Sequence, residues 1–279
     1  MSARPKLQFQ RFTRLQRALH ILMILSFISL ALTGMTVKFA YTKWAYYLAH
    51  LLGGFETAGN IHRFGAIIMV FVFIVHLSDI LRMKRKIFHS WKALILGPDS
   101  MLFNKKDWVD FKASLKWFTF KGERPEYGRW TYWEKFDYFA VFWGIFVIGS
   151  TGATLWFPVF FTQFIPGWVL NVATIIHSDE ALLATGFIFT VHFFNTHLRP
   201  EKFPMDIVIF TGRIPLEEFK LDRPAEYKEL VESGELENYL VEPYQPIVIR
   251  TIKIFGWTAL SLGLFIVVWI IYAMIFAYR

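Results

Sequence analysis

Five stretches of this chain are apolar for about twenty residues each, and they constrain its fold more than any other feature. They are Ala18–Val37, Ile61–Leu81, Phe136–Phe157, His177–Phe194 and Ile252–Tyr278. A helix rises about 1.5 Å per residue, so each stretch is long enough to cross roughly 30 Å of hydrocarbon. No alternating strand pattern competes with them. We therefore expect an all-α integral membrane protein with five transmembrane helices.

Composition supports a membrane protein and narrows its chemistry. Hydrophobic residues make up 55% of the chain, above the roughly 45–50% of average soluble domains. The sequence contains no cysteine. It therefore offers no thiolate for an iron–sulfur cluster, no disulfide and no attachment point for covalently bound haem. Any such centre must belong to a partner protein.

Lysine and arginine are distributed unevenly between the two sides of the spans. They are concentrated before the first span, after the second and after the fourth, whereas residues 158–176 contain none. Because positive charge collects in cytoplasmic loops, we expect a cytoplasmic N-terminus and a periplasmic C-terminus at Arg279, in a bacterial inner membrane. The net charge of +8 reflects this bias, so we expect contact with membrane lipid and no nucleic acid.

The spans divide the chain into a membrane core and attached segments. Residues 83–135, between the second and third spans, carry tryptophans and basic residues and are expected at the membrane interface. The fifth span holds no histidine, so it is interpreted as an anchor or partner-docking helix. The predicted parts are a cytoplasmic segment at 1–17, a four-span core at 18–197 including the loop 83–135, a second cytoplasmic segment at 198–250, and the fifth helix at 251–279.

Five of the eight histidines lie within or at the edge of spans, where polar groups are costly and usually functional. His62 and His76 are 14 residues apart in the second span, and His177 and His192 are 15 apart in the fourth. At about 100° per residue, each pair returns to within roughly 40–60° of one helix face and spans about 21–22 Å. Since neutral imidazole is a good axial ligand of haem iron, this spacing predicts two haems, one near each membrane surface.

The outer and inner positions differ in how well the sequence assigns them. His62 and His177 are both expected at the outer side, where they form one ligand pair. His192 needs a partner on the inner side, and either His76 or His20 can supply it, because one iron takes only two axial ligands. Depth favours His76, since His20 is shallower. His197 lies about 140° around an α-helix from His192, so we expect it at a quinone, a haem propionate or the interface.

Several motifs resemble a known family. They are the run R-x-x-H…L-x-L-T-G from Arg17 to Gly34, the tripeptide Ile61-His62-Arg63, the segment Thr151–His177, and the stretch FTGRIPLEEFKLDRPAEYKEL. Together they resemble the di-haem cytochrome b (gamma) subunit of respiratory formate dehydrogenases, hydrogenases and thiosulfate reductases. The resemblance implies a four-helix haem-binding bundle with two non-covalent b-type haems.

The resemblance also implies a ligand set. It places the outer haem on His62 and His177 and the inner haem on His20 and His192, against the preference from depth. A second similarity, to the cytochrome b of quinol–cytochrome c complexes, supports His76 in place of His20. The choice between His20 and His76 therefore stays open.

Two departures from the four-helix pattern bear on the redox partner. The fifth span is additional, and the run HFFNTHLRPEKFPMD is similar to cytochromes b that accompany periplasmic multihaem cytochromes c. The implied function is electron transfer between menaquinone or ubiquinone and a periplasmic partner, either a multihaem cytochrome c or an iron–sulfur or catalytic subunit. The chain would then be the quinone-reactive subunit of an oxidoreductase complex. The alternative is a haem-free membrane anchor or transporter subunit.

Quinone chemistry moves protons as well as electrons, so its site needs proton-exchanging groups near the inner haem. The candidates are Glu134, Lys135, His197 and Asp79. Each of these residues also has an interpretation without quinone. Asp79 could pair with Arg82, and the others could form ion pairs or polar contacts at the membrane interface. Arg17 and Arg63 are candidate partners of haem propionates or simple boundary charges. Three glycines of the third span, Gly144, Gly149 and Gly152, allow a flat macrocycle or a neighbouring helix to approach.

Overall fold

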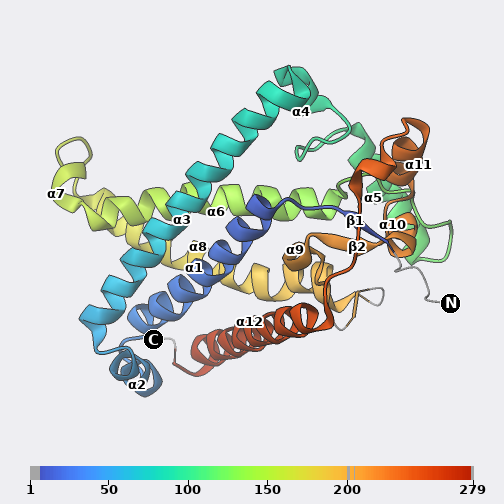
Figure 1. Ribbon diagram of the computed structural model, residues 1–279. Helices are drawn as coiled ribbons and strands as arrows, with labels where there is room; N and C mark the ends of the chain where they lie inside the picture. Colours follow the sequence, from blue (N-terminus) through green and yellow to red (C-terminus); the bar gives the residue numbers. More distant parts are fainter. Residues whose placement is uncertain (1–6, 200–201, 204, 278–279) are drawn as a thin grey trace. The chain divides into compact units, whose positions relative to one another are not determined.

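The computed structural model describes residues 7–199, 202–203 and 205–277, and this part of the chain is almost entirely helical (Figure 1). Five helical segments are long and apolar enough to cross a membrane, and each overlaps one of the predicted spans. They are Arg14–Lys38, Phe55–Phe88, Tyr132–Trp156, Trp168–Leu198 and Pro246–Phe276. The all-α fold with five candidate membrane spans is therefore confirmed. Arg279, which entered the orientation argument, lies outside the described residues.

The long helices begin earlier than the apolar runs alone indicated. Helix α3 begins at Phe55 and α8 at Trp168, so His62 and His177 each lie inside a helix and not at its first residue. The long helices are α1 (Arg14–Lys38), α3 (Phe55–Met83), α6 (Tyr132–Trp156), α8 (Trp168–Phe187) and α12 (Pro246–Tyr272). The shorter ones are α2 (Lys43–Leu51), α4 (Trp91–Leu96), α5 (Lys105–Phe118), α7 (Pro158–Phe161), α9 (Val208–Thr211), α10 (Leu216–Asp222) and α11 (Pro224–Glu232).

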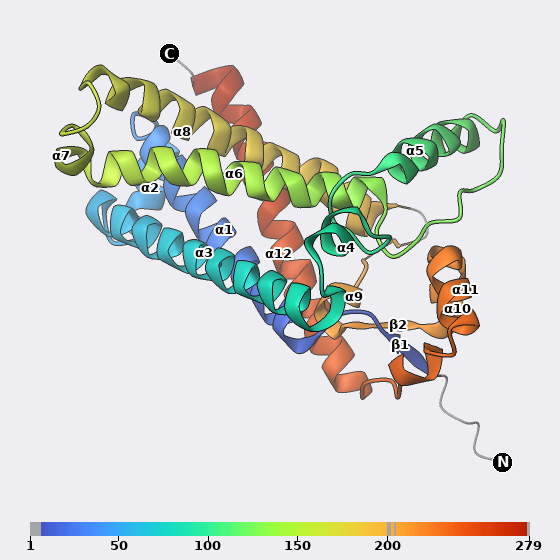
Figure 2. The same cartoon turned by 90° about the horizontal axis from the view of Figure 1, so that it is seen from above.

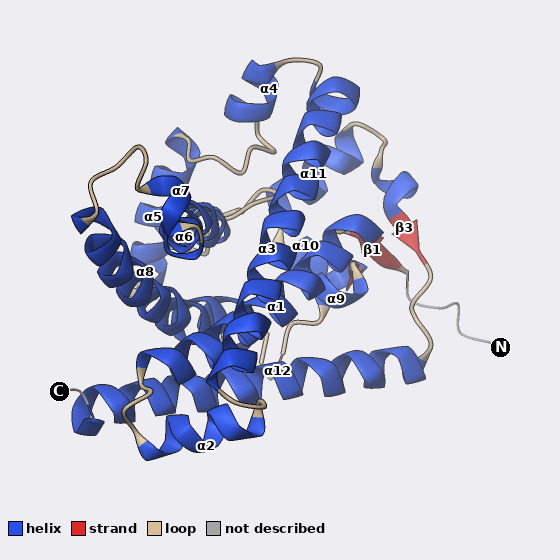
Figure 3. Ribbon diagram, turned by 90° about the vertical axis from the view of Figure 1, so that its left-hand side faces the viewer, coloured by secondary structure: helices blue, strands red, loops and turns tan. Residues whose placement is uncertain are grey.

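A small antiparallel sheet joins three distant segments, in the order β2-β1-β3. Its strands are β1 (Gln8–Gln10), β2 (Arg213–Pro215) and β3 (Leu240–Val241), and strands are drawn red in Figure 3. Phe9 pairs with both Ile214 and Leu240 and is buried. Strands of two or three residues are too short to produce a visible alternation, so the residue pattern did not predict them.

The chain divides into two compact units. The first, which we call the ion-pair unit, comprises Met1–Ala18, His76–Phe139 and Ile207–Lys253. The second, the histidine unit, comprises Leu19–Val75, Ala140–Asp206 and Ile254–Arg279. The ion-pair unit contains the small sheet and most of the charged side chains. The histidine unit contains His20, His62, His177, His192 and His197.

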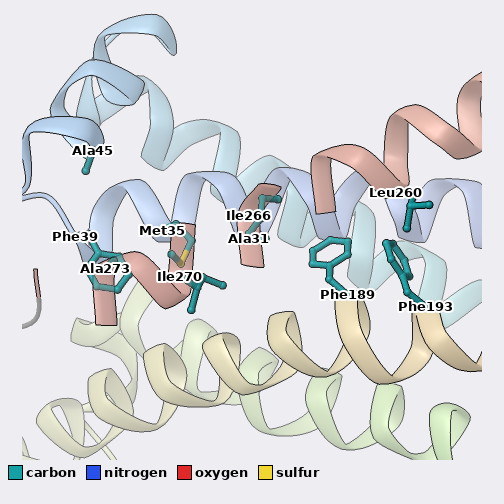
Figure 4. Close-up of a cluster of buried hydrophobic side chains, with 10 residues drawn as sticks. All are labelled: Ala31, Met35, Phe39, Ala45, Phe189, Phe193, Leu260, Ile266, Ile270 and Ala273. Atoms are coloured by element: carbon teal, nitrogen blue, oxygen red, sulfur yellow. The ribbon is translucent and has the colours of Figure 1, made fainter. Parts of the chain in front are cut away.

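The core of the histidine unit is built by α1, α12 and the segment that continues α8 (Figure 4). Leu260, Ile266 and Ile270 of α12 pack with Phe189 and Phe193 and with residues of α1. The fifth span, which lacks histidine, is thus part of the same apolar core as the histidine-bearing helices. Its role in packing was not visible from composition, because every span is apolar.

Large apolar side chains remain uncovered along the spans. Phe71 is 56% exposed, Phe146 75% and Val268 63%. Such surfaces are unfavourable in water but match the hydrocarbon of a bilayer, which is as apolar as the side chains themselves. The exposure therefore agrees with five membrane spans.

Gly263 of α12 provides a direct test of this packing. A Cβ atom built there would lie 2.1 Å from Cδ1 of Phe189, so Gly263→Ala must displace either the phenylalanine or the helix. We expect the substitution to lower the free energy of unfolding by about 1–3 kcal/mol, the usual range for overpacking. Gly149→Ala is the matched control, because nothing lies within 4 Å of its added Cβ. Thermal unfolding of both variants in detergent measures the difference, and equal midpoints would contradict the packing described.

Candidate functional site

His62 of α3 and His177 of α8 face each other inside the histidine unit. Their ring centroids are 6.1 Å apart and the ring planes are inclined by 70°. His177 also contacts α6, which runs alongside α8 (Figure 2). The structure thus brings together the two histidines that the sequence predicted as the outer pair.

Each of these two imidazoles has its Nδ1 atom engaged. His177 Nδ1 lies 3.0 Å from the carbonyl oxygen of Ile148, which can only accept, so Nδ1 carries the proton. His62 Nδ1 lies 2.9 Å from Thr33 Oγ1, whose own hydrogen is donated to the carbonyl of Ser29 at 2.7 Å. The threonine hydroxyl therefore accepts from His62. In both rings Nε2 is left with its lone pair, which is the form of histidine that binds metals.

Small residues line the same histidines. A Cβ on Gly152 would lie 2.9 Å from Cε1 of His177, and one on Gly34 would lie 3.4 Å from Cε1 of His62. Of the three glycines predicted on the third span, only Gly152 contacts a histidine. Gly149 has open space around it, and Gly144 meets only the tip of Ile148 at 3.9 Å.

A second group of histidines, His20, His192 and His197, lies in the same unit. His20 lies near enough to both His192 and His197, and those two lie near enough to each other, that their protonated rings would repel. Phe193 is buried between His192 and His197, with ring centroids 6.4 and 5.7 Å from theirs. Nδ1 of His197 is buried and has no hydrogen-bond partner in the described part of the chain.

The backbone that carries His192 and His197 is not regular α-helix, whereas His20 lies in α1. Residues 188–192 and 194–198 form π-helical turns, in which hydrogen bonds link residues five apart. Residues five apart in such a turn lie on roughly the same side of the helix, so the rotation of about 140° calculated for His197 does not apply here. Nothing in the residue pattern of this segment distinguished a π-helix from an α-helix.

His76 lies in the ion-pair unit. Its Nε2 is 2.9 Å from Oη of Tyr138, a residue of α6. Tyr138 is a partner that the sequence analysis missed. Nearby, Asp79 is buried and pairs with Arg82 at 3.2 Å, which is the plainer of the two interpretations given for this carboxylate.

The two arginines considered for propionates have protein contacts. Arg17 donates from Nε to the carbonyl of Phe210 at 2.7 Å and from a terminal nitrogen to the hydroxyl of Tyr244 at 3.2 Å. Arg63 donates to the side-chain oxygen of Asn60 at 3.1 Å, and its guanidinium lies 6.0 Å from the ring centroid of Trp156. Arg17 belongs to the ion-pair unit and Arg63 to the histidine unit, where it follows His62 directly.

Glu134 is held in a network of buried charges. It pairs with Arg223 at 2.8 Å and with Arg11 at 3.4 Å, and it accepts hydrogen bonds from Thr131. Arg11 also pairs with Glu226 at 3.3 Å. Burial and the neighbouring Arg223 lower the pKa of Arg11, and the two glutamates oppose that shift. This network ties β1 to the start of α6 and to α11.

Lys135 forms a separate buried pair. Its Nζ lies 2.9 Å from Asp107 at the start of α5, and the two side chains are only 2% and 7% exposed. Both residues line an open cavity of about 580 Å³ within the ion-pair unit, beside Arg129, Trp130 and Glu226. Asp107 was missed from the sequence, because a carboxylate at the third position of a helix is usually only a cap.

Comparison with known proteins finds no protein-family model that matches this chain and no curated protein that is similar to it.

The Lys135–Asp107 pair predicts a large effect on stability. Lys135→Met leaves Asp107 buried without its counter-charge, so we expect the free energy of unfolding to fall by about 3–5 kcal/mol. Lys228→Met is the control, because Lys228 and its partner Glu126 are both more than half exposed and such pairs contribute about 1 kcal/mol or less. Chemical denaturation in detergent compares the two. A loss for Lys135→Met no greater than that for the control would contradict a structural ion pair.

Proposed function

We propose that this chain is a membrane-integral di-haem cytochrome b subunit that transfers electrons between a membrane quinone and a periplasmic redox partner. The observation that carries the proposal is the facing pair His62 and His177, each with Nδ1 engaged and Nε2 available. The resemblance to the gamma subunits of respiratory formate dehydrogenases and hydrogenases agrees with this assignment. The five candidate spans suit a protein of the bacterial inner membrane.

The outer pair has the separation that one shared metal ion requires. Two imidazoles bound to one ion through bonds of about 2.0–2.1 Å have ring centroids roughly 6 Å apart, and the observed value is 6.1 Å. Among the described residues, no group of three or more His, Asp or Glu side chains is arranged to hold a metal ion. His62 and His177 would hold a haem here through their Nε2 atoms. Haem, when bound, supplies reversible one-electron chemistry.

The protein orients these ligands through their Nδ1 atoms. The carbonyl of Ile148 and the hydroxyl of Thr33 fix the tautomer of each ring and limit its rotation about the Cβ–Cγ bond. Gly34 and Gly152 leave room beside the rings. Arg63, next to His62 in the sequence, is the residue that we propose to pair with a propionate of this haem.

For the inner haem we favour His20 and His192. His20 lies near His192 and His197 within one unit, whereas a hydrogen bond to Tyr138 engages Nε2 of His76. His192 and His197 themselves lie in π-helical turns, which occur often at functional sites. His197 then adds an imidazole beside the same ligands.

The quinone site needs groups that exchange protons. Lys135 and Asp107 fit best, because they border an open cavity of about 580 Å³ that is large enough for a quinone head group. Glu134 fits less well, since two arginines and Thr131 already engage its oxygens. The quinone is menaquinone or ubiquinone, and the partner is a multihaem cytochrome c or an iron–sulfur subunit.

Single substitutions of the outer pair test the haem assignment. We expect His62→Ala and His177→Ala each to lose about half of the bound haem, because either change removes one of two axial ligands from one site. The haem content of the purified protein and its reduced-minus-oxidised spectrum measure this loss. His50→Ala, an exposed histidine of α2, should retain both haems. A wild-type chain without a b-type spectrum would overturn the proposal in favour of a haem-free anchor or transporter.

The inner ligand is tested in the same way. We expect His20→Ala to lose about half of the haem and His76→Ala, which removes the hydrogen bond to Tyr138, to keep it. Haem loss in His76→Ala but not in His20→Ala would reverse the assignment. Loss in both, or in neither, would contradict the pairing of His192 with a single partner.

A further inference from the structure

Helix α5 is polar on its inner face. Its buried residues are Asp107, Asp110 and Ser114. Each has a charged or polar partner, and these are Lys135 at 2.9 Å, Lys106 at 2.6 Å and the hydroxyl of Tyr127 at 2.7 Å. Burial raises the pKa of Tyr127, so its hydroxyl stays neutral. The Asp107–Lys135 pair and the Ser114–Tyr127 hydrogen bond therefore attach the buried face of α5 to the ion-pair unit, while Asp110 pairs with Lys106 of α5 itself.

The outer face of α5 combines apolar and basic side chains. Trp108 is 59% exposed, Val109 62% and Leu115 49%. At helical spacing these residues alternate with Lys112 and Lys116, which are also exposed. An ordinary surface helix has the opposite arrangement, with its apolar residues inside. The outer face of α5 is typical of helices that lie in a membrane surface, with lysines that reach the head groups.

Phe120 continues this surface just beyond the end of α5. It is 97% exposed and its φ is +58°, in the left-handed region that side chains with a Cβ rarely adopt. Its N–H bonds to the carbonyl of Trp117 at 2.9 Å, and that of Lys121 to Lys116 at 2.8 Å. This is the Schellman arrangement, in which glycine is usual at the position of Phe120. A strained, fully exposed aromatic side chain indicates a function outside the fold.

We infer that α5 and Phe120 form an interfacial anchor that inserts into an anionic lipid surface. Two observations select lipid as the occupant. The first is charge complementarity, because Lys112 and Lys116 lie among the apolar side chains, and the Lys112 ammonium is 5.0 Å from the ring centroid of Trp108. The second is attachment, because the Asp107–Lys135 pair holds α5 to the first turn of α6, a candidate membrane span.

The anchor would fix the ion-pair unit against the bilayer independently of any haem. The apolar side chains would insert below the head groups, and the lysines would make the anchor prefer negatively charged lipids. The inference does not depend on the proposed electron-transfer function, and its test needs no redox measurement.

Spin labels give a direct test, since the chain has no cysteine of its own. Phe120→Cys and Glu232→Cys, an exposed position on α11 of the same unit, are labelled in the full chain and placed in nanodiscs of phosphatidylcholine and phosphatidylglycerol. We expect the label at 120 to be accessible to oxygen, which concentrates in lipid, and protected from a neutral nickel chelate in water. The label at 232 should show the reverse. Equal nickel access at both positions, or protection of position 120 from both reagents by a second copy or another protein, would overturn the proposal.

Two further variants separate depth from charge, with the label on Val109→Cys. Phe120→Gly suits the left-handed conformation, so it should leave the thermal midpoint unchanged or raised while lowering the oxygen access of the label. The double change Lys112→Glu with Lys116→Glu should lower the ratio of lipid-inserted to water-exposed label by about five-fold for each lysine in the anionic nanodiscs. The same pair should have little effect in pure phosphatidylcholine. A lowered midpoint for Phe120→Gly, or a charge effect that is equal in both lipids, would contradict an anionic lipid anchor.

Discussion

Imidazole rings inside apolar helices are the constraint around which the histidine unit is organised. A polar ring in such surroundings is costly unless its nitrogens are satisfied. At His62 and His177 a hydroxyl and a backbone carbonyl satisfy Nδ1, and Nε2 of each ring keeps its lone pair. The close helix spacing at Gly34 and Gly152 follows from the same need, since a Cβ at either position would press on the rings.

The apolar packing of the unit serves these rings as well. Phe189 and Phe193 lie on either side of His192 in the chain, within the π-helical segment, and both belong to the core that α1 and α12 complete. A widened helical turn loses regular hydrogen-bond geometry and needs support from its neighbours. The fifth span gives that support through Leu260 and through the close approach of Gly263 to Phe189. Its function within the fold is therefore to stabilise the segment that carries His192.

The ion-pair unit is held by different forces. Arg11, Glu134, Arg223 and Glu226 join segments far apart in the sequence through buried charge pairs. Such pairs gain little net free energy but fix one arrangement, because any mispairing leaves a buried charge without a partner. The Lys135–Asp107 pair does the same for α5 and turns the apolar face of that helix outward. The Lys135–Asp107 pair thus both attaches the polar face of α5 and leaves its apolar face to contact lipid.

The helical class, the five spans and the closeness of His62 to His177 could be predicted from residue order alone. Hydrophobic length and the depth of polar residues are local quantities, and the bilayer converts them directly into structure. The neighbours of His20, the hydrogen bond of His76 to Tyr138, the π-helical turns and the partners of Glu134 and Lys135 became known only from the folded chain. These depend on contacts between distant segments, such as Arg11 and Glu134, which are 123 residues apart, and on backbone geometry that no residue pattern specifies. Spacing along one helix fixes which residues share a face, but it does not fix which other helix that face meets.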